Sequence, residues 1–588
     1  MATTSTTGVR ARASRARWTT RSTRARVRGD AQRARASREA YDGLWMWLER
    51  RGADVSRVVA DAVTTDANDS ERAQFGVRAK TTLRRGTRAM VIPREVWMDA
   101  TRATEDADVG AALRDARYDA VKQPWVRVAL LLLKERERGA DGEFAAYVAT
   151  LPKTLDSPLF WSADELRDIA GTQLLDNAAG YDAYVRAVYE ELKNGVFVEY
   201  ASTFDVDGAF DEASFRWAFG ILRSRTMAPL DGANVALVPG LDLINHSSLS
   251  GARWRVGGGG GMGGLFGGGS GSGVAAYVEC DRDYDEGAEI FVNYDPEGID
   301  SKFALDYGFI DVVNPSPGYA LTLSIPEDDA NLFDKLDVLE TQGLPEAPTF
   351  TLRPYSDPDR ELRTFLRLLH CKDTDAFLLE ALFRQQCWSL ISEPLSRENE
   401  ADCCASITRG VADALSAYET RSLDQEKAFL TTPPNERQGG IRQEIAVRAR
   451  LSEKSALLEA SAFFDVVASS LDKLEYYQER RLRSLNLLND DDLRRCNRPR
   501  RPPFARIASL SVVSPVRVAD ASVASHPKPF IQFIPFIPSL RVHRTRPRAR
   551  RRASTPIGAR SRVRARASRV RAVVARAVVR SVESIVPR

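Results

Sequence analysis

The stretch LVPGLDLINHSS, residues 237–248, decides the fold. An apolar run reaches Asp242, continues through Leu243 and Ile244, and ends in Asn245 and His246. The chain has only four His, and this one follows an Asn at the edge of an apolar segment. Taken alone, the pair is compatible with a turn that holds a hydrogen-bonded core His, or with a single metal ligand. The surrounding sequence has to decide between these interpretations.

The size and composition of the chain limit the possible classes. A chain of 588 residues is too long to form a single hydrophobic core, so we predict two or three domains. The apolar content of 43% is ordinary for a globular protein. We expect no membrane span, because no apolar stretch approaches 18 residues. The six Cys form no C-x-x-C pair, which argues against a zinc site and a disulfide scaffold and favours a reducing compartment.

Charge is distributed very unevenly along the chain. Residues 1–38 hold eleven Arg and one acid, and residues 498–588 hold twenty-one Arg, one Lys and two acids. The total of +4 therefore leaves about −26 for residues 39–497. Phosphate binding needs clustered Lys and Arg, so we expect no nucleic-acid binding except through the basic tail.

The two basic ends resemble non-globular segments. Residues 1–38 are rich in Arg, Ser and Thr and poor in acid, which is typical of a plastid or mitochondrial transit peptide, the alternative being a disordered arm in a cytoplasmic protein. Residues 498–588 are rich in Arg and Pro. Such a tail can bind nucleic acid or direct nuclear import, but a disordered tail or an erroneous gene-model end fits its composition better.

The first part of the acidic region mixes helical and strand patterns. Residues 41–63 predict a helix followed by a turn, and residues 74–99 predict a β-hairpin around Arg85-Gly86. From 101 to 223 the pattern is helical, with Pro124 near one helix start. Two further helical signals are the capping box SADE at 162–165 and the apolar spacing of FDEASFRWAFGILRSR at 210–225.

Strands are expected again after residue 234, in VALVPGLDLI, VAAYVEC and AEIFVNYD. The Gly-rich segment 257–273 contains G-x-G-x-x-G spacing, but a strand follows it where a dinucleotide site requires a helix, so we interpret it as a flexible inserted hairpin loop. Residues 325–490 have a helical period and predict a second, all-α domain, in which His370-Cys371 is interpreted as core.

Seven segments occur in the order found in one family of proteins. They are QFGVRA (74–79), PWVRVALLLLKERERG (124–139), LPKTLDSPLFWSADELRDIAGTQLL (151–175), WAFGILRSRTM (217–227), LDLINHS (241–247), EIFVNYD (289–295) and ALDYGFID (304–311). With them the chain resembles SET-domain protein-lysine methyltransferases of the Rubisco large-subunit methyltransferase family. The pairing of LINHS with NYD and LDYGF is the most specific part of the match.

The resemblance implies an α+β fold with S-adenosyl-L-methionine as cofactor. A β-rich SET domain would cover residues 39–315, split by a helical insertion over about 100–220. A helical substrate-binding domain would follow over 320–490, between basic disordered termini. The expected partner is a protein substrate, a plastid enzyme, and we expect a monomer without membrane contact.

The resemblance also assigns site residues, and no metal ligand is among them. The residues implied to bind the cofactor are Gln74, Phe75, Gly76, Arg225, Asn245, His246 and Phe309. Those implied to contact the substrate are Arg225, Asp242, Tyr294 and Tyr307. The two tyrosines are the expected catalytic residues, although each taken alone fits an ordinary core position. Relatives often carry an acid and a Gly where Ala73 and Gln74 stand, so one side-chain contact to the cofactor is in doubt.

Methyl transfer to an amine explains why such residues are needed. A lysine with an ordinary pKa of about 10.4 must lose its proton before it can attack, and burial beside a sulfonium favours that loss. Tyrosine rings exclude water and tolerate a cation on their faces. Family members methylate Lys in Rubisco or fructose-bisphosphate aldolase, and one branch methylates a His of actin. That branch lacks the hydroxyl equivalent to Tyr307, so lysine is favoured here; a non-catalytic SET-fold module is the remaining alternative.

Overall fold

The computed structural model describes residues 38–63, 74–227, 235–258, 273–314, 317–385, 388–418, 422–433, 436–437 and 439–487. The predicted arm over 1–38, apart from its last residue, and the predicted tail over 498–588 lie outside these ranges, as does most of the Gly-rich loop over 257–273. The described residues form two compact units. One comprises 38–155 and 180–296, and the other comprises 156–179 and 297–487. The expected domain boundaries at 39–315 and 320–490 stay predictions.

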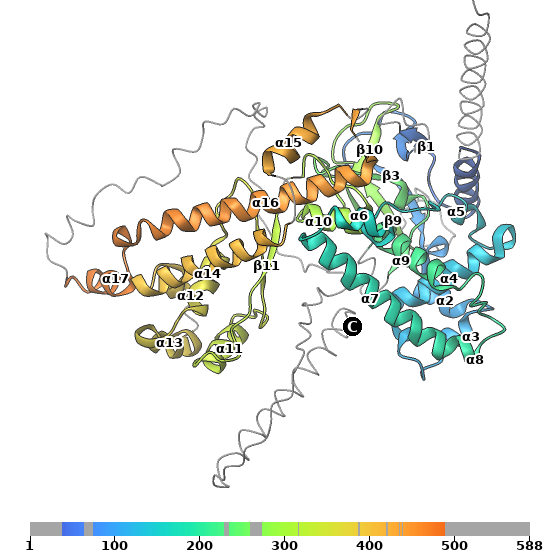
Figure 1. Cartoon of the computed structure of the whole chain (residues 1–588). Coiled ribbons are helices and arrows are strands. Elements are labelled where there is room, and N and C mark those ends of the chain that lie inside the picture. Colours follow the sequence, from blue (N-terminus) through green and yellow to red (C-terminus); the bar gives the residue numbers. More distant parts are fainter. Residues whose placement is uncertain are drawn as a thin grey trace, which may run out of the picture. The chain divides into compact units, whose positions relative to one another are not determined.

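The described part of the first unit contains three small sheets (Figure 1). Their strand orders are β1-β2-β10-β7, β3-β9-β8 and β4-β6-β5. The strands are β1 (Val58–Val63), β2 (Gln74–Ala79), β3 (Arg88–Pro93), β4 (Met98–Asp99), β5 (Thr226–Met227), β6 (Ala236–Leu237), β7 (Asn245–His246), β8 (Arg253–Gly258), β9 (Val274–Glu279) and β10 (Glu289–Val292).

The predicted helix and turn over 41–63 is only half correct. Residues 38–50 are helical, but Val58–Val63 forms β1, which pairs antiparallel with β2. Its valines are β-branched and fit a pleated strand, and Val58 and Ala60 are buried on one face. The helical pattern of the preceding residues ends at the turn around Gly52, where φ is +83°. The strand was missed because VVADAV does not alternate strictly between apolar and polar residues.

The predicted hairpin over 74–99 is wrong. The turn at Gly86 exists, with φ at +79°, but β2 pairs with β1 and β10 while β3 pairs with β9. The two strands that flank the turn therefore belong to different sheets. A hairpin does form between β8 and β9, on either side of the Gly-rich segment. The strand β8 in this hairpin was not foreseen.

The segment 235–244, predicted as a strand, is mostly irregular. Only Ala236–Leu237 is extended, and a 3-10 turn covers Leu241–Leu243. The break is at Gly240, where φ is +85° and a Cβ would lie 2.7 Å from the Leu48 side chain. This turn delivers Asn245 and His246 to β7, which runs parallel to β10 in an otherwise antiparallel sheet.

Helices fill the segment between β4 and β5, as the sequence predicts. Those in the first unit are α2 (Ala100–Glu105), α3 (Gly110–Leu113), α4 (Pro124–Arg138), α5 (Ala145–Val148), α8 (Val196–Glu199) and α9 (Glu212–Arg225), and α7 (Gln173–Asn194) has residues in both units. Pro124 is the first residue of α4, as expected. The expected apolar face of α9 is buried, including Phe215, Ala218 and Phe219.

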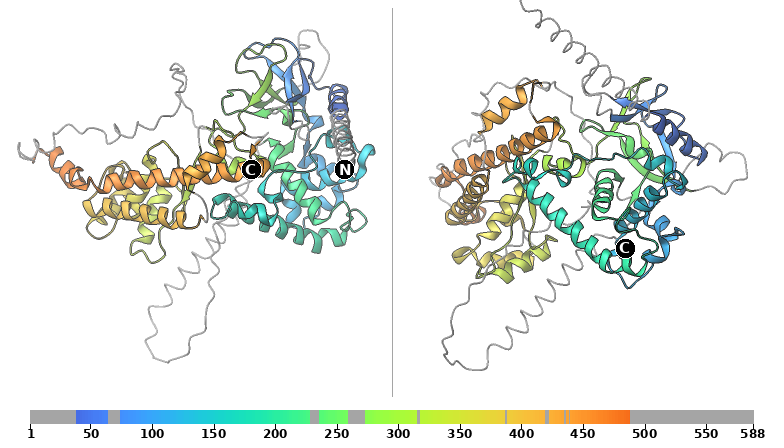
Figure 2. Two further views of the ribbon diagram at one scale, coloured as in Figure 1. Left: turned by 45° about the horizontal axis from the view of Figure 1, so that its top comes forward. Right: turned by 45° about the vertical axis from the view of Figure 1, so that its right-hand side comes forward.

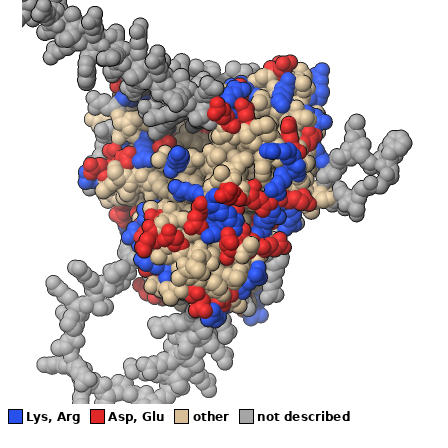
Figure 3. Space-filling view, turned by 90° about the vertical axis from the view of Figure 1, so that its right-hand side faces the viewer, with Lys and Arg blue, Asp and Glu red and all other residues tan. Residues whose placement is uncertain are grey.

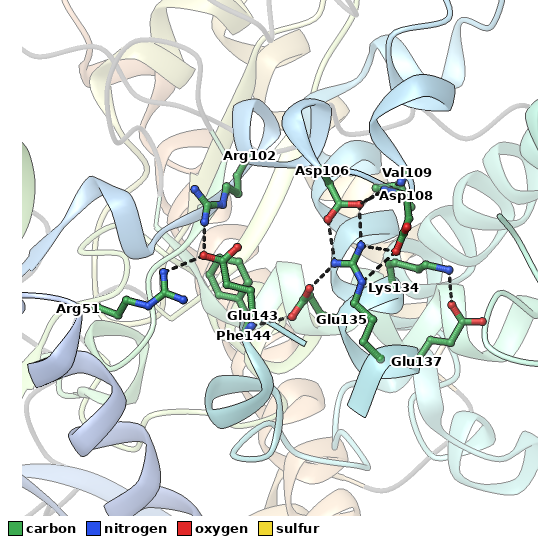
Figure 4. A network of polar contacts seen from close by, with 11 residues as sticks. Arg51, Arg102, Asp106, Asp108, Val109, Lys134, Glu135, Glu137, Glu143 and Phe144 are labelled. Carbon is green, nitrogen blue, oxygen red and sulfur yellow. Dashed lines mark hydrogen bonds and ion pairs between the residues drawn. The ribbon is translucent and has the colours of Figure 1, made fainter. Parts of the chain in front are cut away.

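A polar network closes the carboxyl end of α4 (Figure 4). Arg138 contacts the carboxylates of Asp106, Asp108 and Glu135 at 2.5–2.8 Å. Glu135 is 1% exposed and also accepts the N–H of Phe144 at 2.6 Å. A buried carboxylate with a cation and a backbone donor is well compensated, so this network fixes the chain between α4 and α5.

The second unit is mainly helical. Its helices are α6 (Ala163–Arg167), α10 (Asp300–Tyr307), α11 (Leu332–Thr341), α12 (Arg360–Leu369), α13 (Phe377–Gln385), α14 (Arg397–Ser416), α15 (Leu423–Thr431), α16 (Gly440–Ala468) and α17 (Tyr477–Ser484). Figures 1 and 2 show α14 lying along α16. The predicted capping box of Ser162 and Glu165 is present at α6.

The predicted all-α composition of the second unit needs one correction. An antiparallel pair, β11 (Tyr319–Thr322) and β12 (Thr349–Leu352), adds to the helices. Leu352 packs in the same apolar cluster as helices α12, α14 and α16, and Cys371 is buried in the neighbouring cluster, in agreement with its predicted core position. The pair was missed because short strands 26 residues apart carry little local signal.

The described surface carries charges of both signs. On the face in Figure 3, Lys and Arg alternate with Asp and Glu and do not merge into one basic surface. None of the helices that the structure describes combines the length and apolar character needed to cross a bilayer.

A buried carboxyl lies at the start of α7 within the second unit. Glu453 of α16 is 0% exposed, and its Oε2 accepts the Tyr418 hydroxyl at 2.6 Å and the Gln173 N–H at 3.1 Å. Its Oε1 is buried without a hydrogen-bond partner. Burial raises the pKa of Glu453 from 4.5 to about 7, against the lowering effect of these donors, and nearby Asp176 adds to the rise.

We expect Glu453→Gln to change how stability depends on pH. A raised carboxyl pKa means that the folded state binds the proton more tightly, so its stabilising effect is present below about pH 4.5 and is lost as the pH rises through 7. The Gln variant should match the wild type at pH 5 and exceed it at pH 8 by up to about 3 kcal/mol. Chemical denaturation at both pH values measures this. The exposed Glu380→Gln is the control, and equal curves for Glu453→Gln and wild type at pH 8 would contradict the assignment.

Candidate active site

The Asn-His pair holds together three strands of the first unit. The Asn245 amide donates to the Phe75 carbonyl of β2 at 3.4 Å and to the Glu289 carboxylate of β10 at 2.8 Å. Burial raises the pKa of Glu289, an effect that the Asn245 amide partly offsets. Asn245 therefore bridges β7 to two strands that are distant in sequence.

His246 fixes the position of Tyr294. Its Nδ1 accepts the Tyr294 N–H at 3.1 Å, and the two rings lie 5.0 Å apart. Because Nδ1 accepts this hydrogen bond, the neutral ring carries its hydrogen on Nε2, which lies 3.1 Å from the Ser248 hydroxyl. At the other end of the residue, the Tyr294 hydroxyl donates to the Ile244 carbonyl at 2.8 Å. Both the backbone N–H and the hydroxyl of Tyr294 are therefore hydrogen-bonded to the segment 237–248.

Arg225 and Asp242 form a buried ion pair. Arg225, the last residue of α9, donates through Nη1 to Asp242 Oδ2 at 3.1 Å and to the Asp242 carbonyl at 3.3 Å. The Asp242 side chain is fully buried, and the Arg225 side chain is 19% exposed. Burial raises the pKa of Asp242 against the opposing effect of Arg225. Burial is the largest single influence and would lower the pKa of Arg225, but the Asp242 carboxylate together with Tyr147 and Tyr41 outweighs it, so that pKa is raised.

Two tyrosines that the sequence did not indicate complete this cluster. Tyr147 of α5 is 0% exposed and donates its hydroxyl to Asp242 Oδ2 at 2.8 Å. Tyr41 stacks on Phe75 with ring centroids 3.9 Å apart. Burial raises the pKa of Tyr41, with Arg225 and Asp242 as its charged neighbours. Neither tyrosine lies in a motif, and only the folded chain brings them to the pair.

The expected site residues fall into both units. Phe75, Arg225, Asp242, Asn245, His246 and Tyr294 belong to the first unit and are connected by the contacts above. Gly76 lies in β2 opposite Asp61, and Gln74 begins the same strand, whereas Ala73 lies outside the described residues. The predicted contact of Asp242 with a substrate stays a prediction. In the structure its Oδ2 is held by Arg225 and Tyr147, and its Oδ1 is buried without a hydrogen-bond partner.

Tyr307 and Phe309 lie in the second unit. Tyr307 is the last residue of α10, and their rings lie 6.0 Å apart. Gly308 between them has φ at +73°, and a Cβ there would lie 2.8 Å from the Asp156 backbone. The Ser157 hydroxyl donates to the Leu305 carbonyl at 2.6 Å, which fixes the end of α10 against this segment. Only Gly adopts this left-handed conformation without strain and fits this close to the Asp156 backbone, so a Gly is required between Tyr307 and Phe309.

The residues of the first unit have the chemistry that a sulfonium nucleoside cofactor requires. They offer an amide, a guanidinium, backbone carbonyls, an aromatic face and one buried carboxylate oxygen that lacks a donor. Among the described residues, no three His, Cys, Asp or Glu side chains are grouped as metal ligands would be.

Comparison with known proteins identifies the family. The family model described as Rubisco LSMT substrate-binding matches residues 326–457. The chloroplastic Rubisco large subunit N-methyltransferase of Nicotiana tabacum is 32% identical, over 76% of this chain and 86% of that protein. The chain belongs to this family of SET-domain protein-lysine methyltransferases.

Two further relatives agree with this assignment. The chloroplastic fructose-bisphosphate aldolase-lysine N-methyltransferase of Arabidopsis thaliana is 30% identical, over 77% of this chain and 88% of that protein. The SET domain of LSMT, crystallised with lysine and AdoHcy, aligns with a TM-score of 0.64 and 30% identity over 77% of this chain and 98% of that chain. The chain is therefore an S-adenosylmethionine-dependent protein-lysine N-methyltransferase, and the α+β fold and cofactor expected from the sequence are confirmed.

We expect Asn245→Ala to lower the free energy of unfolding by roughly 1–3 kcal/mol. The variant removes two hydrogen bonds and leaves the half-buried Glu289 carboxylate without its amide donor. Urea denaturation measures the change. The exposed Asn194→Ala, which removes only bonds to Glu190 of the same helix, should stay within about 0.5 kcal/mol of the wild type. Equal losses in both variants would contradict the bridging role.

Proposed function

We propose that this chain methylates the ε-amine of a lysine in a plastid protein. The observation that carries the proposal is the joint arrangement of the Asn245 amide, the His246–Tyr294 contact and the Arg225–Asp242 pair in one unit. The two relatives at 30% identity or more described above are named chloroplastic, and the first 38 residues have the composition of a transit peptide. The substrates of those relatives, Rubisco large subunit and fructose-bisphosphate aldolase, are the first candidates.

The cofactor is proposed to be held by residues of β7 and β2 and by the end of α9. When bound, S-adenosylmethionine supplies a methyl group on a cationic sulfur. Asn245 and His246, with the backbone of Phe75 and Gly76, would hold its polar groups. Arg225 would contact both cofactor and substrate. We carry over Gln74 and Phe309 as cofactor contacts on the family pattern alone.

Tyr294 is proposed to orient the reacting amine. The Tyr294 N–H donates to His246 and the Tyr294 hydroxyl donates to the Ile244 carbonyl, so the ring is fixed in position before the substrate binds. Such preorganisation lowers the entropic cost of aligning amine and methyl. The neutral amine is favoured by burial, and the ring face tolerates the positive charge that develops on nitrogen. Tyr307 is proposed as the second catalytic hydroxyl because it occupies the family position in LDYGF, which also favours lysine over histidine.

A direct test incubates the full chain with radiolabelled S-adenosylmethionine and an extract of plastid proteins. We expect label on a protein band, located on lysine by mass spectrometry. Label on histidine would favour the actin-type branch. Cofactor binding without any labelled protein would favour a non-catalytic module, and both results would reject the proposal.

Tyr294→Phe is expected to lower kcat on the order of 10²-fold while the Kd for S-adenosylmethionine changes by less than about threefold. The variant keeps the ring and removes the hydroxyl that ties it to Ile244. Steady-state kinetics and calorimetry separate the two effects. Tyr277→Phe serves as the control, because that ring lies on β9 against Arg88. Wild-type kcat in Tyr294→Phe would remove this residue from the catalytic set.

A further inference from the structure

Tyr147 stands out among the buried polar groups of the first unit. It lies on the short helix α5 of the helical segment, outside the residues carried over from the family pattern. Its side chain is 0% exposed, and its hydroxyl makes a 2.8 Å bond across 95 residues of sequence to Asp242 Oδ2. A buried hydroxyl normally has a partner, but this one is a carboxylate already paired with an arginine.

The Asp242 carboxylate depends on few donors. Its Oδ2 receives Tyr147 and Arg225, while its Oδ1 is buried without a hydrogen-bond partner. A charge removed from water is tolerated only where its hydrogen bonds are well made. Burial raises the pKa of Tyr147 well above 10, so its hydroxyl stays a donor throughout the physiological range. Without that donor, Arg225 and the backbone N–H of Gly240 alone would have to satisfy the carboxylate.

Arg225 in turn depends on Asp242 for its direction. It is the last residue of α9, followed at once by β5, and its Nη1 donates to both the carbonyl and the carboxylate of Asp242. A long side chain at a helix end has several rotamers, and a fixed acceptor selects one of them. The orientation of the guanidinium therefore follows from the orientation of the carboxylate.

We propose that Tyr147 is a positioning residue for the methyltransferase site: its hydroxyl holds the Asp242 carboxylate, which directs the Arg225 guanidinium. This inference rests on the proposed role of Arg225 at the cofactor. Tyr147 itself acts through Asp242, and no contact of Tyr147 with cofactor or substrate is required.

A merely structural role is the alternative, and the chain offers a matched control. Tyr189 is also buried, at 3% exposure, and its hydroxyl donates to the Phe210 carbonyl at 3.1 Å within the same unit. Tyr147→Phe and Tyr189→Phe each remove one buried hydroxyl. A loss of thermal stability is therefore expected in both, and only the first should alter the site.

The test compares full-length wild type, Tyr147→Phe and Tyr189→Phe by calorimetric titration with S-adenosylhomocysteine, together with melting curves of the ligand-free proteins. We expect Tyr147→Phe to weaken binding about 10-fold, while Tyr189→Phe binds as the wild type does. Equal affinity in all three, with wild type binding normally, would overturn the inference and leave the proposed function intact. A wild type that binds no S-adenosylhomocysteine would reject the proposed function itself.

A double-variant cycle shows whether Tyr147 acts through Asp242. If it does, Tyr147→Phe combined with Asp242→Ala should bind S-adenosylhomocysteine no more weakly than Asp242→Ala alone. Losses that simply add would overturn the inference, because the hydroxyl would then act independently of the carboxylate. So would a Tyr147→Phe protein that fails to fold while Tyr189→Phe folds, since the hydroxyl would then be a requirement of the fold.

Discussion

The first unit depends on the burial of one carboxylate. Asp242 lies on a 3-10 turn, and its partners come from helix α9 and from helix α5, which are distant in sequence. A buried charge with so few donors tolerates little displacement of any of them. The helices between β4 and β5 are therefore essential to the first unit, because they provide both side-chain donors to this carboxylate.

The residues that follow Asp242 connect this turn to the sheet. Three residues after Asp242, Asn245 ties β7 to β2 and β10, and His246 then holds Tyr294. The left-handed turn at Gly240 makes this possible, since a side chain there would collide with Leu48. One short stretch thus joins the helices to the sheet, which explains why LINHS carries so much of the family resemblance.

Local signals in the sequence predicted local structure well. Pro124 begins α4, the Ser162–Glu165 box caps α6, and the apolar spacing of 210–225 gives α9, because each signal acts within one helical turn. Pairing of strands is different. One partner of β2 is β10, more than 200 residues further along the chain, so the hairpin predicted over 74–99 was wrong. The strand β1 is the neighbour of β2 in sequence and was missed because VVADAV does not alternate between apolar and polar residues. Tyr147 was likewise out of reach, because no spacing rule connects it to Asp242.

The position of β10 has a consequence for how the chain is made. This strand lies between β2 and β7, so the sheet that carries the Asn-His pair cannot close until residue 292 is available. The strand β2 must wait, unpaired on one side, while more than 200 further residues leave the ribosome. Pairings of such long range close slowly and expose strand edges in the meantime. Nascent chains of this protein should therefore be clients of chaperones that shield such edges during synthesis.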